Sequence, residues 1–368
     1  MRILIDALNI KRGGGVTVLF RLLNGFSSAG IKVHVILSSE EVHGLLLGEK
    51  CVNSITHELK PDLLGQFSAY KYRLVSLAER AREIGVDCIF GFNYFSPCSF
   101  PQITYHLNVI PYLDVGERVK TVGLFRAVSF RLFSQMSLRQ ACLNIFESEH
   151  LFELAGKTYK KINNPIVRYI GIDEPTDYDH LYAGELKQQI ITLTSGNVHK
   201  RNDLLVELHR RLNKNRSPDK HINLKIGGFG KEKEIRSSLS SADNDYIDTV
   251  GSISFLGYCT RDELFDELAK SMMFVTFSEL ESFYMVALEA MIVGCPVVAP
   301  NISSITESVG KTGFLFDVGD VNQAQVHVEN LFQIDQRCKA SQESKAWAAR
   351  FRQEECVRQL IDSVLAEF

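Results

Sequence analysis

The chain has 368 residues, more than one hydrophobic core usually covers, so two domains are expected. Its 45% apolar and 23% charged residues are typical of a folded globular protein and exclude a disordered or low-complexity chain. The formal net charge of -3 gives no reason to expect a nucleic-acid partner.

Cysteine spacing and hydropathy restrict the setting in which the protein works. The eight cysteines are scattered singly and form no C-x-x-C pair, which predicts reduced core thiols and no metal site. No apolar run approaches the ~18 residues that a membrane-spanning helix needs. The chain opens on a strand-like run, so we expect a cytoplasmic protein without a signal peptide.

The first predicted elements are a strand, a glycine-rich turn and a helix. An apolar strand covers residues 2–8, an amphipathic helix covers 16–29, and a second strand covers 31–37. Three glycines at 13–15 would let backbone amides approach a negatively charged ligand closely. As a dinucleotide fingerprint the turn is incomplete, because Val18 stands where the third glycine belongs. A tight turn without a ligand is the alternative.

A single histidine ends one of the next predicted strands. Strands are expected at 86–90, 102–105 and 143–148, and His106 directly follows the second of them. A neutral imidazole at a strand end could hydrogen-bond a hydroxyl group or orient an acceptor. A structural role is the ordinary alternative for a histidine of this kind.

Basic and large apolar side chains alternate over residues 115–141. The pattern fits a basic amphipathic helix lying on an anionic membrane surface. It fits equally well a helix that packs its apolar stripe on the core and leaves its arginines in solvent. The cations concerned are Arg118, Lys120, Arg126, Arg131 and Arg139.

A turn-rich segment at 164–175 leads to a second series of strands and helices. This series starts with a strand at 189–195, a loop containing Gly196, Lys200 and Arg201, and a helix at 204–212. Cations in such a loop suit a phosphate ligand, and a solvated basic loop is the alternative.

Two further features of the second half concern nucleotides. A strand at 224–228 runs into the glycine turn at 227–230, but Glu232 replaces the Ser or Thr that a P-loop requires after Lys231. A nucleotide triphosphatase is therefore excluded. The next strand, 253–257, precedes Tyr258 and a helix at 263–270.

Two carboxylates lie at the ligand-binding end of the following unit. A strand at 272–277 leads to a loop carrying Glu281, then to a short helix carrying Glu289, and then to a strand at 295–299. Ligands of open α/β sheets bind at the carboxyl ends of the strands. Carboxylates accept hydrogen bonds from hydroxyls, and loop amides suit phosphate oxygens, so a sugar nucleotide fits both. The alternative is a solvated Glu281 and a Glu289 favoured only by the helix dipole.

Residues 281–298 resemble the E-x7-E signature of retaining glycosyltransferases with the GT-B fold, most closely glycosyltransferase family 4. The sequence departs from the usual family form at Ser282, Tyr284 and Val286, where Gly, Gly and Pro are common. The larger Tyr284 would narrow the space over the donor sugar. The matching positions are Glu281, Phe283, Glu289, Ala290, Met291, Gly294, Pro296, Val297 and Val298.

The resemblance implies an α/β protein of GT-B architecture, with two Rossmann-like domains facing each other across a cleft. It places an acceptor-side domain at residues 1–172 and a nucleotide-sugar-binding domain at 173–345. Residues 346–368 would form a C-terminal helix that crosses back to the first domain.

The resemblance also implies roles for the candidate site residues. Glu281 would orient the donor sugar, Glu289 would bind the ribose hydroxyls, and His106 would lie beside the reacting sugar. Lys200 and Arg201 would hold the diphosphate, so that neither a metal nor another cofactor is required. Further donor contacts are expected from Gly14, Gly15, Gly196, Gly228, Tyr258, Ser282, Phe283, Tyr284 and Met285.

The implied reaction moves a sugar from a nucleotide-sugar donor to a hydroxyl of a glycan or lipid-linked glycan acceptor, with retention at the anomeric carbon. Assembly of a bacterial surface polysaccharide, O-antigen or lipopolysaccharide, is the expected setting, with peripheral contact at the inner membrane. A sugar-nucleotide epimerase or a sugar-nucleotide-binding protein of the same fold is the alternative. An NAD-dependent oxidoreductase is a weaker rival, because the dinucleotide fingerprint is incomplete.

Overall fold

The computed structural model describes residues 1–11, 13–49, 55–93, 100–175, 187–228, 232–257 and 259–368. These residues form two compact units. The first unit consists of Met1–Gly171 together with Gln353–Phe368, and the second consists of Ile172–Arg352. An acceptor role for the first and a donor role for the second stay predictions.

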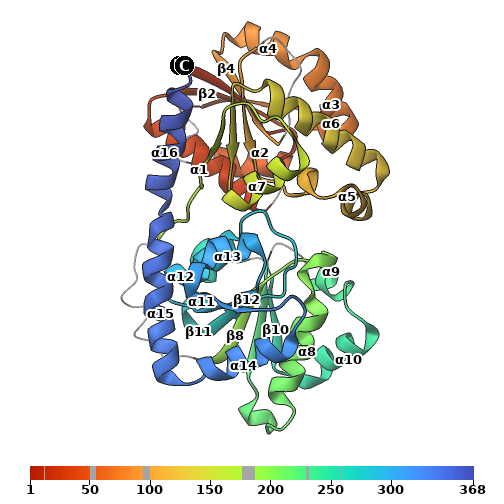
Figure 1. The fold of residues 1–368 in the computed structure, drawn as a ribbon, viewed down its shortest axis with the longest axis vertical. Helices are drawn as coiled ribbons and strands as arrows, with labels where there is room; N and C mark the ends of the chain where they lie inside the picture. The colour runs from red at the N-terminus through yellow and green to blue at the C-terminus, as the bar shows by residue number, and fades with distance from the viewer. Residues whose placement is uncertain (12, 50–54, 94–99, 176–186, 229–231, 258) are drawn as a thin grey trace. The chain divides into compact units, whose positions relative to one another are not determined.

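A parallel sheet forms the centre of the first unit, drawn from red to yellow in Figure 1. Its described strands have the order β3-β2-β1-β4-β5-β6-β7, so the direction of winding reverses between β1 and β4. This is the doubly wound arrangement of Rossmann-like domains. The strands are β1 (Arg2–Asp6), β2 (Lys32–Leu37), β3 (Ile55–Leu59), β4 (Cys88–Phe92), β5 (Gln102–His106), β6 (Leu143–Phe146) and β7 (Pro165–Val167).

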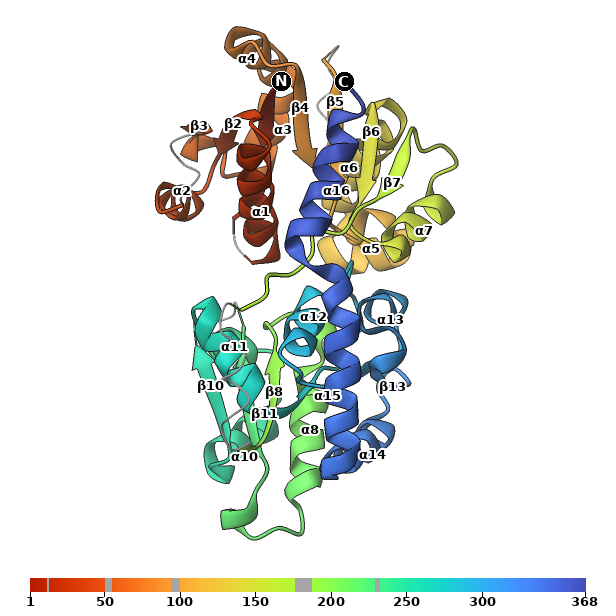
Figure 2. The same cartoon turned by 90° about the vertical axis from the view of Figure 1, so that its left-hand side faces the viewer.

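Helices cover both faces of this sheet, which explains why its central strands β1 and β4 are nearly continuous apolar runs. Ile3, Leu4 and Ile5 of β1 have no exposed surface. The last helix of the chain packs beside the first, as both views show (Figures 1 and 2). The helices are α1 (Gly14–Ser28), α2 (Glu40–Leu47), α3 (Gln66–Val75), α4 (Leu77–Ile84), α5 (Val115–Val122), α6 (Leu124–Gln140), α7 (Glu149–Thr158) and α16 (Gln353–Leu365).

The second unit repeats the same winding with a second parallel sheet. Its described strands have the order β10-β9-β8-β11-β12-β13, and the reversal lies between β8 and β11. The predicted strand at 253–257 is confirmed as β10, and the other predicted strands differ from those observed by a few residues at their ends. The strands are β8 (Lys187–Leu193), β9 (Asn223–Gly227), β10 (Ile253–Gly257), β11 (Ser271–Val275), β12 (Val297–Pro300) and β13 (Phe314–Phe316).

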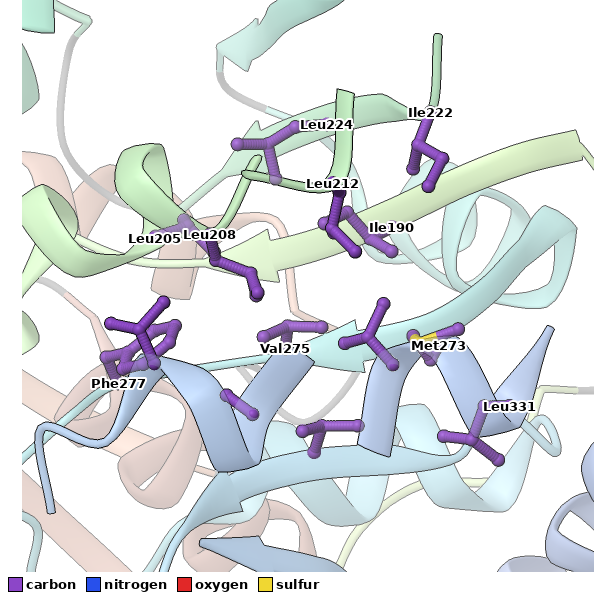
Figure 3. Packing of buried hydrophobic residues seen from close by; sticks show 14 of the residues in the cluster. Ile190, Leu205, Leu208, Leu212, Ile222, Leu224, Met273, Val275, Phe277 and Leu331 are labelled. Carbon is purple, nitrogen blue, oxygen red and sulfur yellow. The ribbon is translucent and has the colours of Figure 1, made fainter. Parts of the chain in front are cut away.

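The core of the second unit lies between its sheet and its helices. Figure 3 shows Leu205 and Leu208 of α8 facing Val275 and Phe277 across this core. Burying a side chain of this size contributes roughly 1.5–3 kcal/mol. The helices are α8 (Asn202–Asn213), α9 (Glu232–Arg236), α10 (Ser241–Val250), α11 (Arg261–Lys270), α12 (Met285–Ile292), α13 (Ser303–Val309), α14 (Val321–Leu331) and α15 (Ile334–Ala348).

The helical run predicted at the C-terminus is divided into two helices. α15 ends at Ala348, a 3₁₀ turn follows at Ala349–Phe351, and α16 begins at Gln353. Between them Arg352 is extended, with φ -60° and ψ 131°. Ile172 pairs with this segment by donating its backbone N–H to the carbonyl of Phe351 at 2.7 Å.

The basic stretch at 115–141 is also two helices, and the expectation of one continuous helix is wrong. Gly123 adopts a positive φ of 78° between α5 and α6, a conformation that a helix interior cannot contain. Arg118, expected to lie in solvent, is instead buried and donates to the carbonyl of Leu113 at 2.6 Å. The remaining cations and several apolar side chains of α6 stay on the surface.

Candidate active site

The candidate residues of the second unit gather where its sheet changes winding direction. Lys200 and Arg201 follow β8, and Glu279 and Glu281 follow β11, the neighbouring strand. The two loops are joined directly, because the backbone N–H of Glu279 donates to the carbonyl of His199 at 2.8 Å. Such a switch point, at the carboxyl ends of the strands, is where open α/β sheets bind ligands.

Two glycines allow these loops to pack against backbone. A Cβ on Gly228, whose φ is 135°, would overlap the backbone carbonyl of Thr194. A Cβ on Gly196 would overlap the backbone carbonyl of Glu234. Both predicted glycines therefore allow a close approach of protein backbone at the ends of β8 and β9, beside the loop that carries the cations.

Lys200 and Glu281 form an ion pair, with 2.5 Å between Nζ and Oε1. Only 16% and 15% of their side-chain surfaces are exposed, so solvent screens the pair less than a surface pair. The hydroxyl of Ser278 donates to the same Glu281 oxygen at 2.6 Å. The structure therefore brings together the predicted sugar-binding carboxylate and the predicted phosphate-binding cation.

Arg201 lies next to this pair in a strained backbone conformation. Its φ of 48° and ψ of 50° are left-handed, which costs a non-glycine residue on the order of 1 kcal/mol or more. Its guanidinium binds Asp203 at 3.1 and 3.0 Å and Glu279 at 2.5 Å. Hydrogen bonding to Asp203, followed by that to Glu279, raises the pKa of Arg201 above its ordinary value.

Tyr284 lies beneath Lys200 and is buried. Its hydroxyl donates to Oγ1 of Thr276 at 3.0 Å, and its ring centroid lies 5.5 Å from Nζ of Lys200. Burial, with a smaller contribution from the Glu281 charge, raises the pKa of Tyr284 well above its usual range. The tyrosine that replaces the usual glycine thus packs inside the second unit and supports Lys200 by a cation–π contact.

The neighbours of Tyr284 in the signature have different surroundings. Phe283 is buried, and its ring centroid lies 5.8 Å from that of Phe351. Ser282 and Met285 are half-buried, and Met285 is the first residue of α12. Tyr258 lies outside the described residues, so its predicted contact with the donor stays a prediction.

Glu289 on α12 is held by an arginine that the sequence analysis did not single out. Nη2 of Arg261 lies 3.3 Å from Oε1 of Glu289, and Nη1 of the same guanidinium binds Asp173. A signal for Arg261 was present, because it is the first residue of α11 after the N-cap Thr260. A cation is unfavourable at a helix N-terminus unless carboxylates compensate it.

His106 of the first unit is completely buried. Its Nε2 lies 3.0 Å from Oδ1 of Asn144, its Nδ1 lies 2.6 Å from the hydroxyl of Tyr112, and its ring stacks on Phe146. Burial lowers its pKa to about 4, so the imidazole is neutral near pH 7. This environment favours the structural alternative over contact with a reacting sugar.

The glycine-rich turn also belongs to the first unit. Gly14 and Gly15 form the first turn of α1, where a free loop was expected, and Gly13 is its N-cap with φ 71°. They follow β1, at the switch point of the first sheet. Their predicted contact with the donor stays a prediction.

The described residues contain no group of three or more His, Cys, Asp or Glu that could hold a metal ion. Six described cysteines are free thiols, and Cys51 and Cys98 lie outside the described part of the chain. Among the helices that the structure describes, none combines the length and hydropathy needed to cross a bilayer.

Residues 188–333 match the protein family described as glycosyl transferases group 1. This segment contains the loops of Lys200 and Glu281 and the helix of Glu289. Among curated proteins, the O-antigen chain mannosyltransferase B of Escherichia coli is 36% identical over 114 residues, 31% of this chain and 30% of that protein. A sulfoquinovosyl transferase of Arabidopsis thaliana is 31% identical over 148 residues, 34% of this chain and 29% of that protein. The matches thus span less than a third of these relatives.

Solved structures show the fold over the whole length. HepE of Anabaena, crystallised with UDP and glucose, superposes with a TM-score of 0.74 at 16% identity and covers 100% of both chains. WaaG, a glycosyltransferase involved in lipopolysaccharide biosynthesis, superposes with a TM-score of 0.76 at 14% identity and covers 98% of each chain. Residues 188–333 therefore match the glycosyl transferases group 1 family, and the chain as a whole has the GT-B fold with two Rossmann-like units.

Proposed function

We propose that this protein is a retaining glycosyltransferase that moves a hexose from a nucleotide-sugar donor to a hydroxyl of a glycan or lipid-linked glycan. In this reaction the bond between the anomeric carbon and the donor phosphate oxygen breaks. A bond from that carbon to the acceptor oxygen forms on the same face. The proton of the acceptor hydroxyl passes to the departing phosphate, so the products are a glycoside and a nucleoside diphosphate.

The observation that carries this proposal is the Lys200–Glu281 pair at the switch point of the second sheet. A half-buried carboxylate accepts strong hydrogen bonds from sugar hydroxyls, and a half-buried ammonium binds phosphate oxygens. Their separation of 2.5 Å suits a ligand whose hydroxyls and phosphates are adjacent, as in a sugar diphosphate.

The remaining residues take roles consistent with their surroundings. Lys200 and Arg201 stabilise the negative charge that develops on the departing diphosphate. A metal ion has this role in other transferases. Glu281 orients the donor sugar, and Glu289 binds the ribose hydroxyls. His106 is left out of the reacting groups, because the side chains around it use both ring nitrogens.

The relatives support a nucleotide-sugar donor and a role in polysaccharide assembly. HepE was solved with UDP-glucose, and the Escherichia coli relative is an O-antigen chain mannosyltransferase. WaaG is involved in lipopolysaccharide biosynthesis. We infer a bacterial surface polysaccharide as the product, assembled at the cytoplasmic face of the membrane.

Helix α6 supports contact with that membrane. Leu124, Phe125 and Leu132 expose 69%, 75% and 54% of their surfaces, beside the exposed Arg126 and Arg131. Apolar side chains interspersed with cations suit the boundary of an anionic lipid surface. The protein should co-sediment with liposomes that contain anionic lipid at low salt, and Phe125→Ser should weaken this binding. Absent binding, or binding that does not depend on salt, would contradict the proposal.

Product analysis tests the proposed reaction. The purified protein is incubated with UDP-, GDP- and dTDP-sugars and with glycan acceptors, and the products are identified by mass spectrometry and by the anomeric NMR coupling. Formation of a glycoside with the donor's anomeric configuration is expected. An isomerised nucleotide sugar would instead indicate the epimerase. Tight binding of a nucleotide sugar without conversion of any donor and acceptor combination would indicate the sugar-nucleotide-binding protein.

A further inference from the structure

Arg261 connects two carboxylates that are far apart in sequence. The residue opens α11, and its guanidinium binds Glu289 of α12 on one side and Asp173 on the other. About a third of the Arg261 side chain is exposed, against 14% for Glu289. The pair with Glu289 is therefore a partly desolvated contact, whose strength depends on a fixed geometry.

The position of Arg261 is costly for the helix that carries it. Thr260 caps α11, and Glu263 completes a capping box that favours negative charge in the first turn. A cation at this helix end is disfavoured by the helix dipole. The two carboxylates offset this cost, so the arginine is better explained by its partners than by helix stability.

Asp173 is itself fixed in place. On the residue before it, the Ile172 N–H donates to Phe351. On the residue after it, Glu174 accepts from Nε of Arg352 at 2.6 Å. The Asp173 carboxylate that binds Arg261 therefore projects from a backbone segment whose two neighbouring residues are both hydrogen-bonded. Its position is restrained accordingly.

We propose that Arg261 is a positioning residue that fixes the Glu289 carboxylate in the orientation in which it accepts hydrogen bonds from the ribose hydroxyls of the donor nucleotide. This inference rests on the proposed function, and specifically on the role of Glu289. A glutamate has three side-chain torsions, and ordering them on ligand binding costs conformational entropy. The salt bridge to Arg261 orders them beforehand, so that less binding energy is lost.

The experiment compares ribonucleotides with their deoxy counterparts. Calorimetry gives Kd values for UDP and 2′-deoxy-UDP, and for GDP and 2′-deoxy-GDP, with the wild type and with Arg261→Ala, Arg261→Lys, Asp173→Asn and Glu289→Ala. The wild type should prefer the ribose form by about tenfold or more, because it forms a hydrogen bond to a charged group. Arg261→Ala should reduce this preference nearly as far as Glu289→Ala does, and Arg261→Lys should restore part of it.

The ratio of the two affinities separates positioning from a general structural effect. A variant that merely loosens the fold weakens the ribose and deoxyribose ligands equally and leaves the ratio unchanged. The matched control is Arg210→Ala, because Arg210 also bridges two carboxylates of the same unit, Glu207 at 2.7 Å and Asp243 at 2.9 Å. This control should keep the wild-type ratio.

Three results would overturn the inference, and they differ in what they say about the function. If Glu289→Ala loses the ribose preference while Arg261→Ala keeps it, the positioning role is wrong and the proposed function stands. If neither variant changes the preference, the role of Glu289 is wrong as well. If the wild type binds neither UDP nor GDP, and no sugar nucleotide is turned over, the proposed function itself fails.

Discussion

Nζ of Lys200 lies 2.5 Å from Oε1 of Glu281, at the carboxyl ends of two neighbouring strands of one sheet. Each side chain compensates the other's charge in a half-buried site. Ser278 and the ring of Tyr284 hold the pair from two further directions. The proposed donor-binding groups are therefore ordered by one another, and a change to either one should affect both sugar and phosphate recognition.

Glu281→Gln should lower kcat by about 100-fold or more, if the carboxylate contacts the transition state more strongly than the bound donor. The amide keeps the size of the side chain and loses its charge. Steady-state kinetics with the best sugar nucleotide provide the measurement, and Glu267→Gln serves as the control because Glu267 forms an ion pair of similar exposure with Lys225. Turnover close to that of the wild type would exclude the proposed role of Glu281.

Lys200→Ala should weaken the binding of a nucleoside diphosphate by about tenfold or more, while the binding of the nucleoside changes little. The substitution removes the ammonium that faces phosphate in the proposal. A suitable control is Lys225→Ala. Lys225 lies 2.8 Å from Glu267, and the two side chains are 22% and 20% exposed, so this ion pair resembles the Lys200–Glu281 pair in length and exposure. Titration calorimetry with UDP and uridine measures the difference, and equal losses for both ligands would argue against phosphate contact.

The fold was predictable because its strands are buried on both faces. Parallel strands covered by helices are continuous apolar runs, so β1 and β11 could be recognised from composition, although their predicted ends differ by a few residues. The breaks at Gly123 and Arg352 were harder to predict. The stretches on either side are helical. Gly123 ends α5 locally through its positive φ, whereas the break at Arg352 accompanies a tertiary contact, the Ile172–Phe351 hydrogen bond.

The site was predictable in its loops and less so in its contacts. Lys200 and Glu281 follow strands that could be recognised, but their mutual ion pair depends on β8 and β11 being neighbours in the sheet. Arg261 reaches Glu289 across 28 positions, and His106 reaches Asn144 across 38. Local sequence patterns do not record contacts over such separations, so the burial of His106 and the contact of Arg261 with Glu289 could be seen only in the structure.

Tyr284→Phe should reduce the free energy of unfolding by about 1 kcal/mol, because the hydroxyl loses its hydrogen bond to Thr276. The ring beneath Lys200 remains, so the affinity for a nucleoside diphosphate should change by less than twofold. Tyr284→Leu removes the ring as well and should also lower that affinity. Urea unfolding and calorimetry separate the two effects. Equal affinities in the leucine variant and the wild type would show that the cation–π contact is dispensable.

Two buried histidines should make the protein less stable in mild acid. Burial lowers the pKa of His106 in the first unit and of His209 in the second to about 4, against 6.5 for an exposed imidazole. Between pH 6.5 and 4 the unfolded chain therefore binds protons that the folded chain does not. Each histidine should remove up to about 3 kcal/mol as the pH falls through this window and should have no effect above it.

Urea unfolding at several pH values between 7.5 and 5 tests this pH dependence. His106→Gln should lower stability at pH 7.5, because the ring stacked on Phe146 is lost, yet it should make the fall in stability toward pH 5 shallower. His209→Gln should do the same for the second unit, and if the two units unfold separately each variant should alter only one transition. A variant at position 106 with the full wild-type slope would mean that His106 is protonated in the folded protein, and that its hydrogen bonds to Asn144 and Tyr112 are rearranged.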